Sequence, residues 1–178
     1  MKKICMITLA LMISVSLAGC SLFNGNELTE ITLPASMMNN SEMTLLSDLN
    51  KYAEENEFES AEWNDDGSLT ITLTNKRKAS LRKQMEEGLL DSFDNIVNSP
   101  DTHYIQSIKA SQDYRTVTIT ADREEYENSF ELTTYIVGMS VVIFQSYAGE
   151  EAYVNVVVVD TETGAQIDFS HYPGEEQV

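Results

Sequence analysis

Residues 64–67 read Asn-Asp-Asp-Gly, a run of oxygen-bearing side chains that invites a calcium-binding interpretation. An EF-hand loop places oxygen ligands at alternate positions, a glycine sixth and a glutamate twelfth. Counted from Glu62, the run matches the early positions, but the twelfth residue is Leu73, which supplies no carboxylate. Asp-Gly between two alternating segments is a strong hairpin signal. We therefore predict a hairpin turn at residues 64–67, and another at residues 160–164.

The chain has two histidines, His103 and His171. A zinc site needs three or four convergent His, Cys or carboxylate ligands, and two histidines so far apart in sequence predict no shared metal site. His171 continues the alternation of Ile167 and Phe169, so we expect it to cap the apolar face of a sheet.

Catalytic motifs are missing from the sequence: there is no Gly-x-Ser-x-Gly and no glycine-rich phosphate loop. The carboxylate pairs Glu54-Glu55 and Glu124-Glu125 fall at helical positions where a solvated face is expected. A glycosidase pair needs a cleft and a separation of roughly 5 to 9.5 Å, which a sequence cannot supply. We assign no catalytic residue, no metal and no cofactor.

The first twenty residues have the layout of an export signal. Lys2 and Lys3 precede an apolar run at residues 4–17, and small residues follow at Ala18 and Gly19. This order is typical of a secretory signal peptide. A run of about 14 residues is short for a hydrocarbon core of ~30 Å.

Residues 17–20 read Leu-Ala-Gly-Cys and match the four-residue lipobox, so the N-terminus resembles a bacterial lipoprotein precursor. The resemblance implies cleavage before Cys20, transfer of a diacylglyceryl group to its thiol, and a place at the extracytoplasmic face of the cell membrane. Each buried CH₂ contributes about 0.8 kcal/mol, so two or three acyl chains make a stable anchor. Cys5 lies in the leader, which would leave the mature chain without a disulfide. An ordinary signal peptide with a chance cysteine, or an uncleaved anchor, is the alternative.

The length and the net charge of the chain after residue 19 limit the number of domains and the kinds of partner to expect. Removal of residues 1–19 would leave 159 residues, about one domain, and would change the net charge from −18 to −20. Such a charge disfavours nucleic acid and repels anionic headgroups within about 8 Å. It also keeps an exported domain soluble, and an acidic patch for a basic partner is the alternative. We divide the chain into a signal peptide (1–19), a lipidated tether (20–28), one domain (29–173) and a frayed tail (174–178).

Periodicity predicts an α+β fold. Residues 68–73 align with residues 116–121 at an offset of 48, which favours repeated helix–hairpin units. We expect one mostly antiparallel sheet of about seven strands, with three helices on one face. The expected strands are 30–33, 58–63, 69–74, 104–111, 116–121, 153–159 and 165–172. The expected helices are 41–56, 75–98 and 123–147.

The whole chain also resembles small lipoproteins of Gram-positive anaerobes, a group for which we know no established activity. The shared features are the lipobox, a Leu-Pro-Ala segment at residues 33–35, the Asp-Gly hairpin with alternating threonines, and the charged helix that follows it. The resemblance implies location and a fold, and it carries over no site residue.

Two features favour a binding surface. Residues 132–148 contain no charge, and their apolar side chains surround the helix, which predicts a core helix or, alternatively, a surface for a partner or for lipid. Threonines alternate with apolar residues in two strands and predict an open sheet face that could dock a protein or a glycan, although a plain solvated face is the alternative. These threonines are Thr70, Thr72, Thr74, Thr116, Thr118 and Thr120.

Together these features predict a lipid-anchored extracytoplasmic protein that acts as a non-enzymatic interaction or binding module. The expected partners are the membrane, through the lipid on Cys20, and an unidentified protein or glycan, with no role for nucleic acid. One alternative is a cell-envelope enzyme that uses surface carboxylates. Another is a lipoprotein that binds a small ligand in a closed apolar pocket under the third helix.

Overall fold

The computed structural model describes residues 25–38, 48–129 and 132–174. The signal peptide, the lipobox and Cys20 lie outside the described residues, as do residues 175–178 of the predicted tail. The strands are β1 (Leu28–Leu33), β2 (Ser60–Trp63), β3 (Leu69–Thr74), β4 (Ile105–Ala110), β5 (Thr116–Ala121), β6 (Val154–Asp160) and β7 (Gln166–Tyr172). The helices are α1 (Ala35–Met38), α2 (Leu49–Glu55), α3 (Asn75–Val97), α4 (Arg123–Asn128) and α5 (Thr133–Ala148), with a 3₁₀ turn η2 at Pro100–Thr102.

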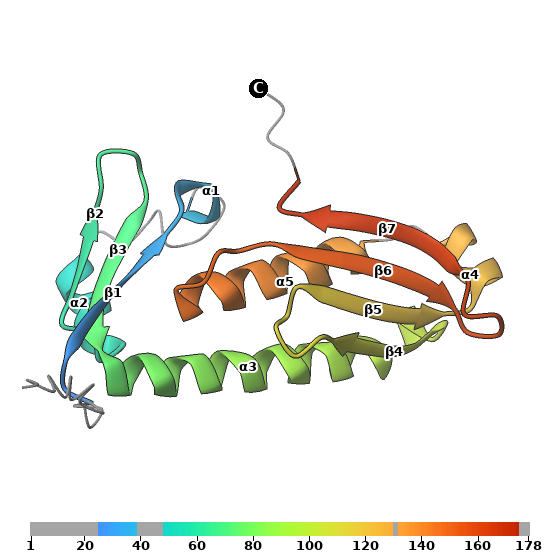
Figure 1. The fold of residues 1–178 in the computed structure, drawn as a ribbon, viewed down its shortest axis with the longest axis horizontal. Helices are drawn as coiled ribbons and strands as arrows, with labels where there is room; N and C mark the ends of the chain where they lie inside the picture. The colour runs from blue at the N-terminus through green and yellow to red at the C-terminus, as the bar shows by residue number, and fades with distance from the viewer. Residues whose placement is uncertain (1–24, 39–47, 130–131, 175–178) are drawn as a thin grey trace, which may run out of the picture.

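The α+β class is confirmed, but the single seven-stranded sheet is wrong. The strands form two sheets, one in the order β1-β3-β2 and the other in the order β4-β5-β6-β7 (Figure 1). The physical reason is α3, whose 23 residues span about 35 Å between β3 and β4. Neighbouring strands must lie within about 5 Å, so a helix of this length carries the second hairpin beyond reach of the first sheet.

The second sheet contains a parallel pair that the hairpin pattern did not reveal. β5 pairs with β6 in parallel, with Thr116 opposite Asn155 and Ala121 opposite Asp160. All other strand pairs in the two sheets are antiparallel. A parallel pair needs a long crossover, and α4 and α5 provide it.

The helices differ from the expected three on one face. The helix expected at residues 123–147 is two helices, because α4 ends at Asn128 with Ser129 as its C-cap, and α5 begins at Thr133. Within its described part the first expected helix begins at Leu49, where the Asp48 carboxylate accepts hydrogen bonds from the backbone of Asn50 and Lys51. α3 is confirmed within one residue at each end, and Thr74 is its N-cap.

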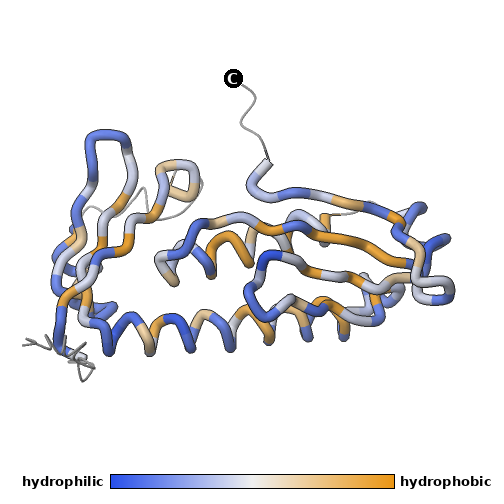
Figure 2. Tube along the Cα trace, in the orientation of Figure 1, coloured by the Kyte–Doolittle hydropathy of each residue, from blue (hydrophilic) through white to orange (hydrophobic). Residues whose placement is uncertain are grey.

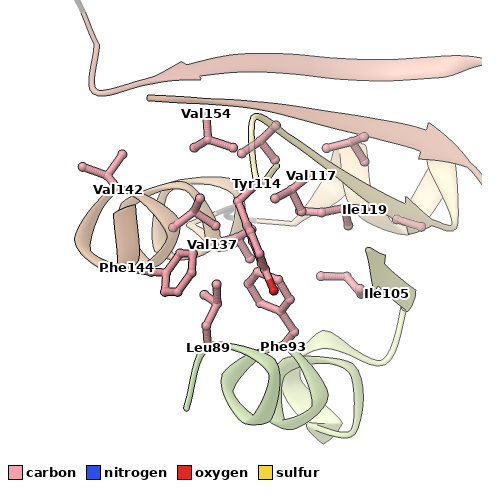
Figure 3. Close-up of a cluster of buried hydrophobic side chains, with 14 of the residues drawn as sticks. Leu89, Phe93, Ile105, Tyr114, Val117, Ile119, Val137, Val142, Phe144 and Val154 are labelled. Carbon is pink, nitrogen blue, oxygen red and sulfur yellow. The ribbon is translucent and has the colours of Figure 1, made fainter. Parts of the chain in front are cut away.

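The apolar side chains form two clusters that share α3. The cluster under the three-stranded sheet includes Ile31, Leu69, Ile71 and Leu81. The larger cluster, under the four-stranded sheet, contains residues of α3, α5 and the strands, and Figure 3 shows them converging. Met85 of α3 packs against both clusters, so this helix joins the two halves of the fold.

A β-bulge reverses the expected phase of β7. Val158 pairs with Asp168 while Val159 pairs with Gln166, so Ile167 has no partner between them. Ile167 therefore packs toward the core, whereas Phe169 is 52% exposed and His171 is also exposed on the opposite face. The expectation that His171 caps the apolar face of the sheet is wrong.

Candidate functional site: an apolar groove between two helices

The uncharged helix α5 is buried on one side and exposed on the other. Val137, Val141 and Phe144 are almost fully buried, as expected for a core helix. Large apolar side chains nevertheless reach solvent from the other side, and they recur at helical spacing along it. They are Leu132, Tyr135, Ile136 and Ile143, with exposed fractions of 52%, 52%, 47% and 37%. We call these four residues the α5 stripe.

The α5 stripe continues into a groove of about 220 Å³ between α5 and α3. The two helices pack side by side, and Figure 3 shows Leu89 of α3 close to Phe144 of α5. The lining residues are Gln84, Met85, Gly88, Leu89 and Ser92 of α3, with Ser140, Ile143 and Phe144 of α5.

Small residues keep the groove open. Apart from its chain neighbours and the nearby backbone of α3, no atom lies within 4 Å of the place where a Cβ would stand at Gly88, so a side chain there would project into free space. The Ser140 hydroxyl donates a hydrogen bond to the Ile136 carbonyl at 2.8 Å, within its own helix. The groove therefore offers mainly apolar surface.

The electrostatic character of the groove comes from α3. Glu87 and Asp91 are exposed and lie on either side of Gly88 along the helix. Glu87 pairs with Lys83 at 3.5 Å, an exposed pair of the i,i+4 type that contributes little. No charged residue occurs in α5 itself. Glu87 and Asp91 are sequence neighbours of the lining residues Gly88 and Ser92, and Arg82, which pairs with Glu150, lies 5.8 Å from the centre of the Phe144 ring. The border of the groove therefore carries two carboxylates and one paired cation, which suits an apolar side chain that has basic neighbours.

The six threonines do point away from the two apolar clusters, but they do not form one surface. Thr70, Thr72 and Thr74 lie on β3, whereas Thr116, Thr118 and Thr120 lie on β5, in the other sheet, and all six are half-buried. Several have structural partners: Thr74 caps α3, Thr70 accepts from the Asn64 amide at 2.9 Å, and Thr120 accepts from Ser107 at 3.1 Å. The six threonines therefore belong to two sheets, three to each, and not to the single sheet that was expected to present them.

The acidic turns are hairpin turns. Gly67 adopts a φ of +80°, the conformation that the Asp-Gly turn requires. The Ser68 hydroxyl and backbone N–H donate to Asp66 at 2.6 and 2.9 Å, and these bonds hold the pKa of Asp66 below its usual 3.8. Hydrogen bonds from Thr163 likewise lower the pKa of Asp160. These carboxylates stabilise their own turns.

The histidines have separate partners. His103 lies 3.1 Å from Glu125, and His171 lies 2.8 Å from Asn155. Among the described residues, no three His, Cys, Asp or Glu side chains gather as a metal site.

The paired glutamates at 54–55 and 124–125 are exposed. Asp160 is the one acidic side chain that is buried in the described ranges; it accepts hydrogen bonds from Thr163 of its own turn and lies 3.9 Å from Arg123 of α4. No described helix is long and apolar enough to cross a membrane.

The sequence missed the residues that make the groove. Gly88 and Ser140 come from helices far apart in the chain, and no motif in the sequence marks either of them. One signal was present, because a glycine inside a helix destabilises it by roughly 1 kcal/mol relative to alanine and calls for a reason. No family model, curated protein or solved structure matches the chain.

Proposed function

We propose that this protein is a lipid-anchored binding module at the extracytoplasmic face of the membrane, and that the groove between α3 and α5 docks an amphipathic segment of a protein partner. The observation that carries the proposal is the α5 stripe. Three large apolar side chains of the uncharged helix α5, and Leu132 at its N-cap, stay exposed next to a groove with an apolar floor. Contiguous apolar patches of this kind mark interaction surfaces.

The size of the groove favours a protein segment over a small ligand. Pockets for small molecules typically measure about 300–1,000 Å³, and this groove of about 220 Å³ is open to solvent. A groove between two helices is a common seat for an amphipathic helix, which inserts apolar residues at helical spacing. The spacing of the α5 stripe matches such a partner.

Charge complementarity favours a basic partner. Glu87 and Asp91 flank the groove, and the chain has a formal net charge of −18. Association of two copies through this groove would bring two strongly negative surfaces together, which like-charge repulsion opposes. We therefore expect apolar anchor residues flanked by Lys or Arg in the partner.

The test uses two synthetic peptides with leucines at helical spacing, one with lysines and one with glutamates on the polar face. The protein should bind the leucine–lysine peptide more tightly than the leucine–glutamate peptide. Gly88→Leu fills the groove from an open position and should weaken binding by more than tenfold, since one buried leucine contributes about 1.5–3 kcal/mol.

The matched control is Leu90→Ala. Leu90 is another exposed apolar residue of α3, 46% exposed, and it does not line the groove. This variant should bind like the wild type. Equal binding by wild type and Gly88→Leu, with both folded, would mean that the groove is not the docking site.

The anchor is tested separately. In a bacterial host that processes lipoproteins, the wild-type chain should incorporate a labelled fatty acid and fractionate with membranes, and Cys20→Ser should do neither. Incorporation that survives Cys20→Ser would contradict the assignment of the anchor to this residue.

A further inference from the structure

We propose that the basic first half of α3 binds the anionic headgroups of the membrane in which the Cys20 anchor sits, and so holds this end of the domain against the bilayer. The inference rests on the lipid anchor of the proposed function. It adds a second membrane contact, of electrostatic kind, and therefore an orientation.

The cations of the chain are concentrated in one place. Residues 75–85 hold five of the eleven Lys and Arg residues and none of the twenty-nine Asp and Glu residues. These five are Lys76, Arg77, Lys78, Arg82 and Lys83, and we call them the α3 basic cluster. Cations near the start of a helix oppose its dipole, so helix stability does not account for them.

The α3 basic cluster lies where the anchor must be. The backbone N–H of Lys76 donates to the Gly25 carbonyl at 2.9 Å, and that of Asn75 donates to the Glu27 carbonyl at 2.8 Å. Five residue steps separate Gly25 from Cys20. A chain spans at most about 3.6 Å per residue, so the lipidated residue stays within roughly 18 Å of the start of α3.

Nearby carboxylates neutralise only part of the cluster. Arg77 lies 3.6 Å from Glu57, and its side chain is 15% exposed. Arg82 pairs with Glu150 at 2.6 Å. Lys83 is 76% exposed in an exposed pair with Glu87, and Lys76 is also exposed. Lys76 and Lys83 are therefore the cations best placed to meet headgroup phosphates.

A shallow hollow of about 260 Å³ adjoins the cluster. Lys76, Arg77, Thr74 and Ser80 contribute to its lining, together with Glu57 and Glu59. The two glutamates reduce the local positive charge. The contact we propose is accordingly a broad electrostatic one, with the lysines outside the hollow contributing to it.

The acidic end of the domain lies far from this contact. Asp122, Glu124, Glu127 and Glu162 surround another hollow, beside α4 and the turn between β6 and β7. Figure 1 places α4 at the opposite end of the molecule from the start of α3, and Figure 2 shows how hydrophilic that start is. The length of α3, about 35 Å, is several times the screening length of about 8 Å. The carboxylates around α4 therefore act weakly on headgroups at the start of α3, whereas Glu57 and Glu59, beside the cluster, oppose the contact.

The experiment uses the lipidated full-length protein, reconstituted into phosphatidylcholine vesicles with and without phosphatidylglycerol. An environment-sensitive dye is attached at Ala79→Cys, an exposed position inside the basic cluster, or at Glu162→Cys, at the far end. Cleavage before Cys20 would remove Cys5, and acylation would block Cys20, so each processed protein carries one reactive thiol. Protection of the dye from a water-borne quencher is measured, and fatty-acid labelling of each sample is recorded.

Phosphatidylglycerol should protect the dye at Ala79→Cys and leave the dye at Glu162→Cys accessible. Lys76→Gln/Lys83→Gln should weaken this protection, because each cation near an anionic surface changes binding about fivefold. The matched control, Lys109→Gln/Arg123→Gln, also removes one exposed lysine and one cation of an i,i+4 pair, and it should change nothing.

Three outcomes would overturn the inference, and they are distinguishable. A labelled protein whose dye is equally accessible in both vesicle types refutes the lipid contact and leaves the anchor intact. Protection that needs whole cell envelopes shows that the cluster binds another anionic component. A protein without fatty-acid label refutes the anchor, and the proposed orientation falls with it.

Discussion

Gly88 and Gly138 are both helical glycines, yet the same change to alanine should shift stability in opposite directions. At Gly88 of α3 no atom outside the nearby helix backbone and the chain neighbours lies within 4 Å of the Cβ position. Alanine there gains the helix propensity that glycine lacks, and the free energy of unfolding should rise by about 1 kcal/mol. The position is exposed, so nothing offsets the gain.

At Gly138 of α5 the Cβ would overlap a neighbouring ring. It would lie 2.2 Å from Cδ2 and 2.6 Å from Cγ of Tyr172, whereas ordinary contacts begin near 3.4 Å. The ring would have to retreat by roughly 1 Å, and Cγ can move only with a new rotamer or a shift of β7. The Tyr172 hydroxyl donates to Thr134 at 3.3 Å, and its backbone pairs with Val154, so both movements disturb other contacts.

The expected magnitude follows from these contacts. Overpacking typically destabilises by 1–3 kcal/mol or more, and the helix-propensity gain offsets about 1 kcal/mol of the clash. Gly138→Ala should therefore lower the free energy of unfolding by up to about 2 kcal/mol, a gap of about 1–3 kcal/mol from Gly88→Ala. For a chain of this size 1 kcal/mol corresponds to about 2–4 °C in Tm.

Denaturant unfolding measures the gap, followed both by far-UV circular dichroism and by the fluorescence of Trp63, the single tryptophan. A double-mutant cycle isolates the cause: in a Tyr172→Ala background the overlap is gone, and Gly138→Ala should stabilise. If Gly138→Ala were at least as stable as the wild type, the close packing of α5 against β7 would be refuted.

Three further variants test other parts of the structure. The pKa of Asp66 is lowered in the folded state, so its ionised carboxylate stabilises the fold at pH values above 3.8, and this contribution is lost as the pH falls below 3.8. Ser68→Ala removes a hydrogen bond to Asp66, so it should raise the pKa of Asp66 in an NMR titration and reduce the loss of stability in acid. Burial, and then the hydrogen bond to Glu86, raise the pKa of Tyr114 from 10 to about 12, so stability should fall between pH 10 and about 12. Glu86→Gln should lower the pKa of Tyr114 but keep it above 10, measured by absorbance against Tyr114→Phe. Ile136→Ser should lower the free energy of unfolding by only about 1 kcal/mol, because about half of the Ile136 side chain is already exposed, while weakening binding of the leucine–lysine peptide.

The sequence predicted the hairpins and α3 because these elements depend on residues that are close together in the chain. The alternation at residues 69–74, the Asp-Gly turn before it and the helical stripe at residues 81–93 each involve neighbours in the chain. The division into two sheets is not local. It depends on β1 reaching past β2 to pair with β3, and on β5 pairing with β6 across two helices. Nothing in the alternation of a strand identifies its partner.

The sequence predicted the type of surface that α5 offers, but not which of its residues are exposed. The absence of charge from residues 132–148 correctly indicated a mostly buried helix, and contact with a partner was among the alternatives. Which side of α5 stays exposed depends on where α3 crosses it, and that is a tertiary fact. The threonines illustrate the converse: their alternation correctly put them opposite the apolar faces, but two separate sheets cannot present them together.

The groove and the α3 basic cluster both lie on α3, so the distance between them decides whether the lipid surface influences binding in the groove. Gly88, at the groove, is twelve residues from Lys76, or about 18 Å along the helix axis. With Lys76 at the headgroups, Gly88 lies about two screening lengths from it along the helix, whereas Lys83, at the other end of the cluster, is five residues or about 7.5 Å from Gly88. A basic partner segment in the groove would then be attracted by Glu87 and Asp91 more than by the anionic lipid. Dilution of the salt lengthens the screening distance, so lipid and groove should begin to compete for the leucine–lysine peptide in phosphatidylglycerol vesicles at low ionic strength. Binding that is indifferent to phosphatidylglycerol at every salt concentration would show that this peptide reaches the groove without sensing the bilayer, and would contradict the proposed orientation.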